Sequence, residues 1–120
     1  MGIYGEDLEE IIAQLIEDKF LDEERFTRSY VRGKFRMNKW GKIRIKQELK
    51  KRKISDYCVR KGMEEITEEE YIEQIRAVLL KKAATLNEDN DYKRRNKLAA
   101  HAFRRGYETE LVWSIINKME

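Results

Sequence analysis

The chain has 120 residues, of which 41% are hydrophobic and 41% are charged, and a net charge of +3. This length excludes two large domains, and this apolar content excludes a disordered chain. Proline is absent and there are only six glycines, so the composition predicts an all-α fold. The single cysteine, Cys58, excludes an intramolecular disulfide and is typical of a cytoplasmic protein.

Hydrophobic periodicity predicts a first helix over residues 7–19 and a second over residues 22–37. The first has one apolar stripe, made of Leu8, Ile11, Ile12, Leu15 and Ile16. The second begins at Asp22, a residue type that caps helices. Its cations fall within about a quarter turn of one another; they are Arg25, Arg28, Arg32, Arg36 and Lys39. We expect both flanks of this helix to pack while the stripe stays open to a partner, because five like charges on one face repel each other.

The next segment, Asn38-Lys39-Trp40-Gly41-Lys42, sets an indole among cations. We expect Trp40 to plug the gap between helices, and stacking on a partner is the alternative. A third helix spans about 42–52 and buries Ile45 and Leu49, and a short fourth helix begins at Ser55, its N-cap residue. The third helix region is rich in further cations, namely Lys42, Arg44, Lys46, Lys50, Lys51, Arg52 and Lys53.

Three more helices follow. Thr67 and Glu70 form a capping box that opens a long fifth helix, which ends before the polar stretch 87–91. The sixth spans about 91–105, is expected to bury Leu98, Ala102 and Phe103, and stops at Gly106, a residue suited to the left-handed position after a helix. It contributes a thinner set of cations, namely Lys93, Arg94, Arg95, Lys97, Arg104 and Arg105. The seventh places Leu111, Val112, Ile115, Ile116 and Met119 on one stripe.

The order of one long helix and two shorter ones occurs twice. When the chain is aligned with itself at one constant offset, Ile45 falls on Leu98 and Val59 on Val112, which indicates an internal repeat. We therefore expect an elongated, curved array. Residues 1–20 would hold the last helix of an incomplete first repeat, and residues 21–66 and 67–120 would each form a three-helix repeat. A chance match between amphipathic helices is the alternative. The apolar stripe near the N-terminus would favour a weak dimer over a monomer.

Residues with catalytic potential form no recognisable motif. His101, the only histidine, stands between alanines without a ligand at metal-binding spacing, which is typical of a surface histidine. Cys58 has no histidine near it, as expected of a half-buried structural thiol. The acidic runs 22–24 and 68–70 lie at helix starts, where the helix dipole accounts for them. We expect a binding protein that is not an enzyme and uses neither a cofactor nor a metal.

The charge is sorted along the chain. Residues 1–24 hold nine acids and one base, residues 25–62 hold fifteen bases and two acids, and residues 63–75 hold six acids and no base. The acidic N-terminus is incompatible with a signal peptide, and the longest apolar run, 77–80, is too short to span a membrane. The basic block favours a polyanionic or acidic partner, and an ordinary solvated surface is the alternative.

Several of these segments together resemble the RecX family. They are Lys19-Phe20-Leu21-Asp22-Glu23-Glu24-Arg25-Phe26, Tyr30-Val31-Arg32, Gly41-Lys42-Ile43-Arg44-Ile45, Glu48-Leu49-Lys50 and Lys53-Ile54-Ser55. Lys53 stands where the family usually has glycine, and Arg104-Arg105-Gly106-Tyr107 resembles the turn of its last unit. The resemblance implies three tandem three-helix units, of which this chain would hold the end of the first and all of the other two. It also implies a role in DNA repair, recombination and the SOS response, through binding in the groove of the RecA filament on single-stranded DNA.

We hypothesise that the RecA filament or its DNA contacts the basic helix faces, above all Arg28, Arg32 and Arg36 together with Arg44, Lys51 and Arg52. The full predicted set is Arg25, Arg28, Arg32, Arg36, Lys39, Trp40, Lys42, Arg44, Lys50, Lys51, Arg52, Arg94, Arg95, Arg104 and Arg105. One alternative is a protein that binds DNA without sequence preference. Another is a structural adaptor that uses apolar groove contacts.

Overall fold

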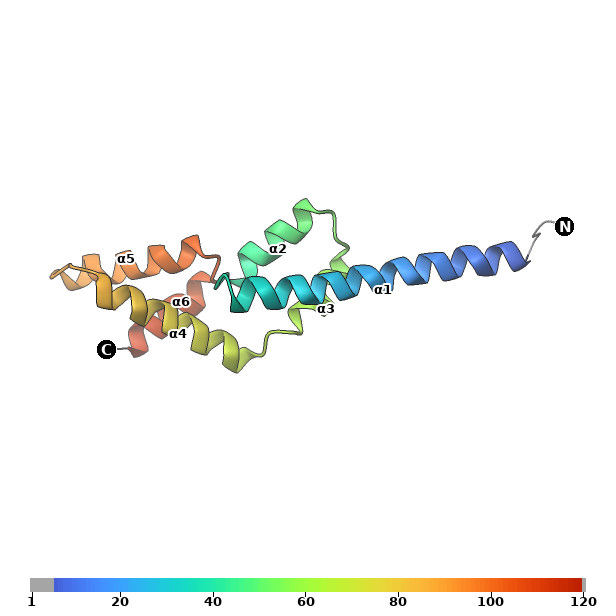
Figure 1. Ribbon diagram of the computed structural model, residues 1–120. Coiled ribbons are helices and arrows are strands. Elements are labelled where there is room, and N and C mark those ends of the chain that lie inside the picture. The colour runs from blue at the N-terminus through green and yellow to red at the C-terminus, as the bar shows by residue number, and fades with distance from the viewer. Residues whose placement is uncertain (1–5, 120) are drawn as a thin grey trace.

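The computed structural model describes residues 6–119, which form six helices and no strand. The helices are α1 (Glu6–Arg36), α2 (Lys42–Lys51), α3 (Asp56–Met63), α4 (Glu68–Thr85), α5 (Asp91–Arg104) and α6 (Thr109–Lys118). The molecule is elongated, with extents of 80 × 24 × 21 Å (Figure 1). The predicted all-α, elongated fold is confirmed, and no described helix is long and apolar enough to cross a membrane.

Helix α1 is one uninterrupted helix of 31 residues. The prediction of two helices, over 7–19 and 22–37, is therefore wrong. Asp22 does not cap a helix but lies inside one, where it forms an exposed ion pair with Arg25. The segment around it contains neither glycine nor proline, so nothing stops the helix. Residues 8–22 are exposed throughout and project beyond the rest of the molecule (Figure 1).

The C-terminal half of α1 packs against α2 and α3. Thr27 and Val31 are fully buried there, and Gly62 of α3 lies so close that a Cβ added to it would meet the Thr27 methyl group at 2.7 Å. Ser55 caps α3 by accepting a hydrogen bond from the Cys58 amide, as predicted. On one flank of α1 Val31 and Phe35 are buried, and on the other Tyr30 packs against the core. The expectation that both flanks pack is wrong for Phe26 and Met37, which are 44% and 84% exposed.

Helices α4, α5 and α6 form a second group around the buried residues Tyr71, Ile75, Leu79, Leu98, Ala102, Val112 and Ile116. The capping box of Thr67 and Glu70 is present, and Gly106 has a φ of 94°; both features are as predicted. Phe103 is 36% exposed, so its predicted burial is wrong. Ala99, together with Ala102, is buried on α5.

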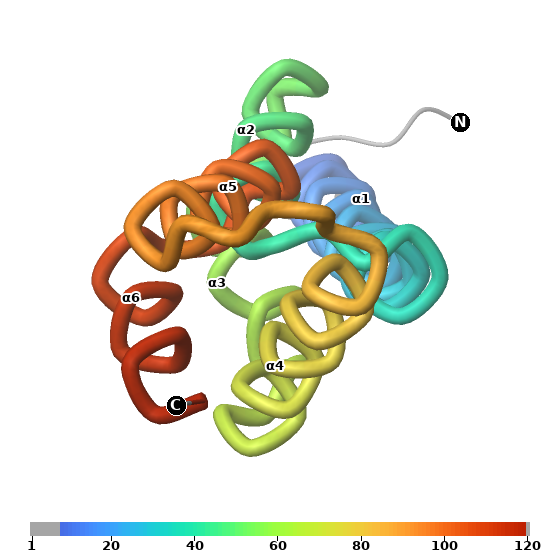
Figure 2. Tube along the Cα trace, turned by 90° about the vertical axis from the view of Figure 1, so that its left-hand side faces the viewer, coloured from blue at the N-terminus to red at the C-terminus, as the bar shows by residue number. Residues whose placement is uncertain are grey.

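The two groups meet where the start of α2 abuts the turn between α5 and α6. Gly41, the N-cap residue of α2, offers no side-chain cap, so the second group satisfies the free amides of this helix end. The Gly41 amide donates to the Arg105 carbonyl at 2.7 Å, and the Ile43 amide donates to the Gly106 carbonyl at 3.0 Å. A Cβ on Gly41 would lie 2.2 Å from the Gly106 backbone. Figure 2 shows the result, with α2 and α5 on the same side of the molecule.

Two buried tyrosines complete this junction, with ring centres 5.7 Å apart. The Tyr71 hydroxyl accepts from the Lys42 amide at 2.9 Å and donates to the Glu108 carboxylate. The Tyr107 hydroxyl donates to the Lys39 carbonyl at 2.6 Å. Burial raises the pKa of both phenols above their ordinary values, so both donate as neutral groups. The assignment of residues 1–20, 21–66 and 67–120 to separate repeats stays a prediction.

Candidate partner-binding surface

We define the α1 stripe as Arg25, Arg28, Arg32 and Arg36 of α1 together with Lys39, which follows the end of this helix. Arg28 lies at its centre and is held by three carboxylates. Its guanidinium is 3.1 Å from Glu24, 3.0 Å from Glu65 and 3.4 Å from Glu64, and its side chain is only 28% exposed. The hydrogen bond that Arg28 donates to the Glu24 carboxylate raises the pKa of Arg28 above its ordinary value. Arg28 therefore links α1 to the segment between α3 and α4.

The next two arginines of the stripe are paired in the same way. Arg32 binds the Glu65 carboxylate, and Arg36 lies 3.3 Å from Glu70. The hydrogen bond from Arg32 is the main reason why the pKa of Glu65 is lowered. The stripe is open at Arg32 and Arg36, which are 45% and 55% exposed although each is paired with a carboxylate, whereas the expectation of an open side chain is wrong for Arg28. The mutual repulsion of the three arginines is relieved within the chain, because the acidic block 63–75 folds back onto them.

The indole of Trp40 packs against the core and is half-buried. The Lys34 ammonium lies 4.8 Å from its ring centre and the Arg44 guanidinium 4.2 Å. This arrangement is the inter-helix plug that the sequence predicts. Two further predicted residues are held similarly, since Lys42 lies over the Tyr71 ring and Arg52 over the Tyr30 ring.

A different set of cations faces solvent. Lys46 and Lys50 on α2 and Lys53 just after it are exposed, and among the described residues none of the three has an ion-pair partner within 4.0 Å. We call these the α2 lysines. Their neighbour Lys51 is paired with Glu48 at 3.2 Å. Lys53 has a φ of 61°, the left-handed conformation that suits the glycine usual at this place in the RecX-like pattern.

The predicted cations of α5 are less available. Arg94 is half-buried and reaches the Ala83 carbonyl at 3.4 Å, and Arg95 is 3.2 Å from Asp91. Arg105 is half-buried and donates to the Asn38 carbonyl at 3.2 Å. Arg104 is exposed. The second group therefore adds one solvent-facing arginine from the predicted set.

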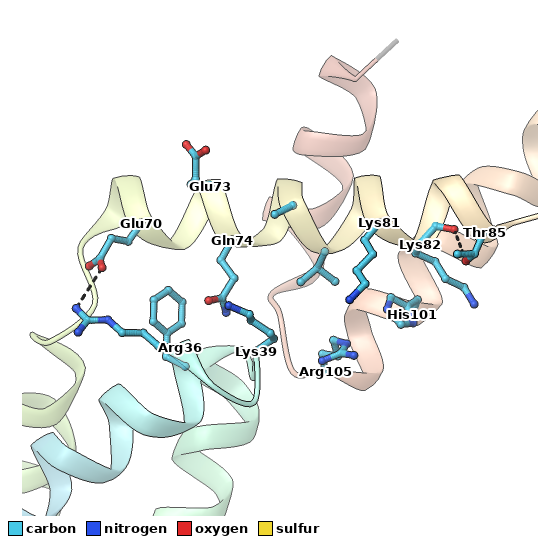
Figure 3. A pocket seen from close by; sticks show the side chains of 13 residues that line it. Arg36, Lys39, Glu70, Glu73, Gln74, Lys81, Lys82, Thr85, His101 and Arg105 are labelled. Atoms are coloured by element: carbon cyan, nitrogen blue, oxygen red, sulfur yellow. Dashed lines mark hydrogen bonds and ion pairs between the residues drawn. The ribbon is translucent and has the colours of Figure 1, made fainter.

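A groove lies where the end of α1 faces α4 and α5 (Figure 3). It encloses about 750 Å³, and its apolar lining comes from Phe35, Ala77 and Val78. Its cations are Arg36, Lys39, Lys81, Lys82 and Arg105. Sequence reasoning missed Lys81 and Lys82, which lie outside the basic block of residues 25–62. No pattern in the sequence of this long helix indicates that a groove forms beside Lys81 and Lys82.

His101 also lines the groove, half-buried rather than on the open surface that the sequence indicated. Burial, aided by the charges of Arg105 and Lys82, lowers the pKa of His101 below its ordinary value. Cys58 is fully rather than half buried. Within residues 6–119, no group of three His, Cys, Asp or Glu side chains is placed to hold a metal ion. The described surface therefore offers exposed lysines on α2 and a groove between α1, α4 and α5, both of which suit binding.

Known proteins resemble this chain along most of its length. The family model of the RecX second three-helix domain matches residues 22–63, and that of the RecX third three-helix domain matches residues 68–116. Regulatory protein RecX of Clostridium acetobutylicum is 33% identical over 93% of this chain and 51% of its own. Regulatory protein RecX of Oceanobacillus iheyensis is 23% identical over 96% of this chain and 42% of its own. The chain thus spans about half the length of these curated relatives.

The fold is also that of a solved structure. The crystal structure of RecX from Lactobacillus salivarius matches 98% of this chain and 76% of its own, with a TM-score of 0.77 and 23% sequence identity. This likeness covers α1 as well as both groups of helices, and it supports the arrangement of the helices alone.

Proposed function

The chain belongs to the RecX family, and from this premise we propose that it is a cytoplasmic regulator that binds the RecA filament on single-stranded DNA and inhibits recombinase activity. It acts by binding, without a cofactor and without chemistry of its own. A filament offers DNA phosphates and acidic protein surface along a continuous groove. An elongated molecule with exposed cations along α2 complements such a groove.

The observation that supports this proposal is the unpaired state of the α2 lysines. Lys46, Lys50 and Lys53 can meet an anion without breaking an ion pair with any described carboxylate. Arg28, Arg32 and Arg36 would each have to leave a carboxylate first, which offsets what they gain from a new partner. We therefore place the main contact on α2, which also carries Arg44, with the exposed Arg104 of α5 as an extension.

Two double variants test the proposal. Lys46→Glu with Lys50→Glu should weaken co-sedimentation with RecA-coated single-stranded DNA about tenfold or more, because two attractive charges become repulsive, and should relieve inhibition of strand exchange. The control, Lys81→Glu with Lys82→Glu, changes the net charge equally but on α4. If the first variant binds as wild type does, or if both variants lose the same amount of binding, the proposal that α2 makes the main contact is contradicted.

Binding to DNA alone is the second candidate function, since the same lysines suit phosphates. Salt separates the two, because contacts with phosphate weaken steeply as salt rises. We expect the chain to prefer RecA-coated DNA over naked single-stranded DNA at matched salt. Equal affinity for both, with the same salt dependence, would make the chain a DNA-binding protein without sequence preference.

A further inference from the structure

The segment that follows α3 pairs with the α1 stripe through its carboxylates. Glu65 lies 3.0 Å from Arg28 and also binds Arg32. One turn further along α1, Arg36 lies 3.3 Å from Glu70 (Figure 3). Three successive arginines on one face of α1 therefore hold carboxylates of their own chain.

These carboxylates resemble an anionic ligand in their chemistry. The planar fork of a guanidinium binds a carboxylate and a phosphate in the same geometry. Arg28, Arg32 and Arg36 follow each other at four-residue intervals, which is about 6 Å along the axis of a helix. Such a regular row of cations suits a linear polyanion better than a single small anion.

The chemistry favours a nucleic-acid strand over an acidic protein as this polyanion. An acidic protein offers carboxylates, so it would replace the present partner of each arginine by an equal one. A strand carries a negative charge at every nucleotide, and its binding also releases condensed counterions. The carboxylates of the chain offer no such gain, so phosphates can compete with them.

The carboxylate of Glu65 competes for this row from a fixed position. The Glu65 amide donates to the Gly62 carbonyl at 3.0 Å, and the amide of the buried Ile66 donates to the Met63 carbonyl at 3.1 Å. Only the side chain of Glu65 has to move to release Arg32, which is 45% exposed. An incoming phosphate therefore displaces a carboxylate that stays nearby at a high effective concentration.

We propose that the α1 stripe is a binding surface for single-stranded nucleic acid whose arginines are already occupied by carboxylates of the chain itself, above all by Glu65. This autoinhibitory contact lowers the affinity of the stripe for phosphates without abolishing it. Nucleic acid then binds mainly through other cations until the carboxylates are displaced. The stripe does not include the α2 lysines, so its masking does not depend on the proposed filament contact.

Fluorescence anisotropy with a labelled oligothymidylate, in the absence of RecA, tests this masking. Glu65→Gln removes the charge that holds Arg32 and keeps the size of the side chain. Glu69→Gln is the matched control, because Glu69 is exposed and, within the described residues, has no cation within 4.0 Å. Glu65→Gln should bind about tenfold more tightly than this control. The logarithm of its affinity should also fall more steeply with the logarithm of the salt concentration, by about 0.7 for the added phosphate contact at Arg32.

Arg32→Gln completes the comparison. In the wild-type chain it should change the affinity by less than about twofold, because Arg32 is already paired. In the Glu65→Gln chain it should remove most of the gain, since two residues that interact are not additive. Equal affinity of Glu65→Gln and Glu69→Gln, or the same loss from Arg32→Gln in both chains, would overturn the proposal.

Poly-glutamate is the second probe. If Glu65→Gln gains as much affinity for poly-glutamate as for oligothymidylate, the ligand is an acidic protein and the assignment to nucleic acid is wrong. Circular dichroism checks the folding of every variant. If Glu65→Gln does not fold, Arg32→Gln in the wild-type chain decides alone: unchanged affinity agrees with masking, and a large loss contradicts it. Because RecA is absent, each of these results leaves the proposed filament binding untouched.

Discussion

The contact between Gly41 and Gly106 makes a sharp prediction about stability. Gly41→Ala would place a Cβ 2.2 Å from the Gly106 carbonyl group and 2.4 Å from the Tyr107 amide. All of these atoms belong to the backbone, so they cannot rotate away as a side chain does. The φ of Gly41 is −79°, which alanine adopts readily, so the effect is steric. The two groups of helices must move apart.

The cost follows from what the junction loses. Separation breaks three hydrogen bonds, donated by the amides of Gly41, Lys42 and Ile43, at about 1 kcal/mol each. The smaller conformational freedom of alanine in the unfolded chain returns about 0.5–1 kcal/mol. We expect a net loss of about 2–2.5 kcal/mol in the free energy of unfolding, a large part of the usual total of about 5–15 kcal/mol.

Urea denaturation followed by circular dichroism measures this loss. Gly33→Ala is the matched control, because a Cβ there meets nothing within 4 Å and the residue lies inside α1. It should stabilise the protein by about 0.5–1 kcal/mol. If Gly41→Ala leaves the unfolding midpoint unchanged while Gly33→Ala shifts it upward, the close approach of the two groups does not exist in solution.

Three smaller predictions concern single side chains. Thr67→Ala removes the capping box of α4 and should cost about 1 kcal/mol in thermal denaturation, whereas Thr67→Ser should cost much less. The hydrogen bond from the Ser55 amide lowers the pKa of Glu23, so the stabilisation by this carboxylate is present at neutral pH and is lost as the pH falls through the lowered pKa. The urea midpoints of Glu23→Gln and of wild type should therefore differ at neutral pH and converge in acid. A difference that stays constant with pH would contradict this. Trp40→Ala should lower the free energy of unfolding by about 2 kcal/mol, because the burial of the indole is lost. If Trp40→Ala instead loses filament binding while its stability is unchanged, the result would favour stacking of Trp40 on the partner.

The helix ends were predictable where a local signal sets them. Ser55 and Thr67 cap their helices through their own side chains, and Gly106 takes a backbone conformation that other residues avoid. Asp22 is also a residue type that caps helices, but it lies inside α1 and caps no helix. A capping residue favours a helix start only when the preceding turn is already broken, and residues 19–21 are good helix formers. The sequence therefore shows possible starts more reliably than actual breaks.

The candidate surface was less predictable, because it depends on contacts between distant segments. The sequence shows that residues 25–62 are basic and that residues 63–75 are acidic. It does not show that side chains of the two blocks pair with each other, since charged side chains are normally expected to face solvent. Arg28 and Glu65 are 37 positions apart, and only the fold brings them together. Lys81 and Lys82 were missed for the same reason, since three helices must meet before they line a groove.

This pairing changes which experiment can identify the partner contact. Reversing Arg32 and Arg36 to glutamate appears a direct test from the sequence, but in the folded chain it sets new carboxylates beside Glu65 and Glu70. The repulsion would loosen α1 from the start of α4, so lost inhibition would follow whether or not these arginines touch the filament. Within the part of the chain that the structure describes, Lys46 and Lys50 have no carboxylate to lose. Their reversal leaves the internal ion pairs intact, and any loss of binding then reports on the partner alone.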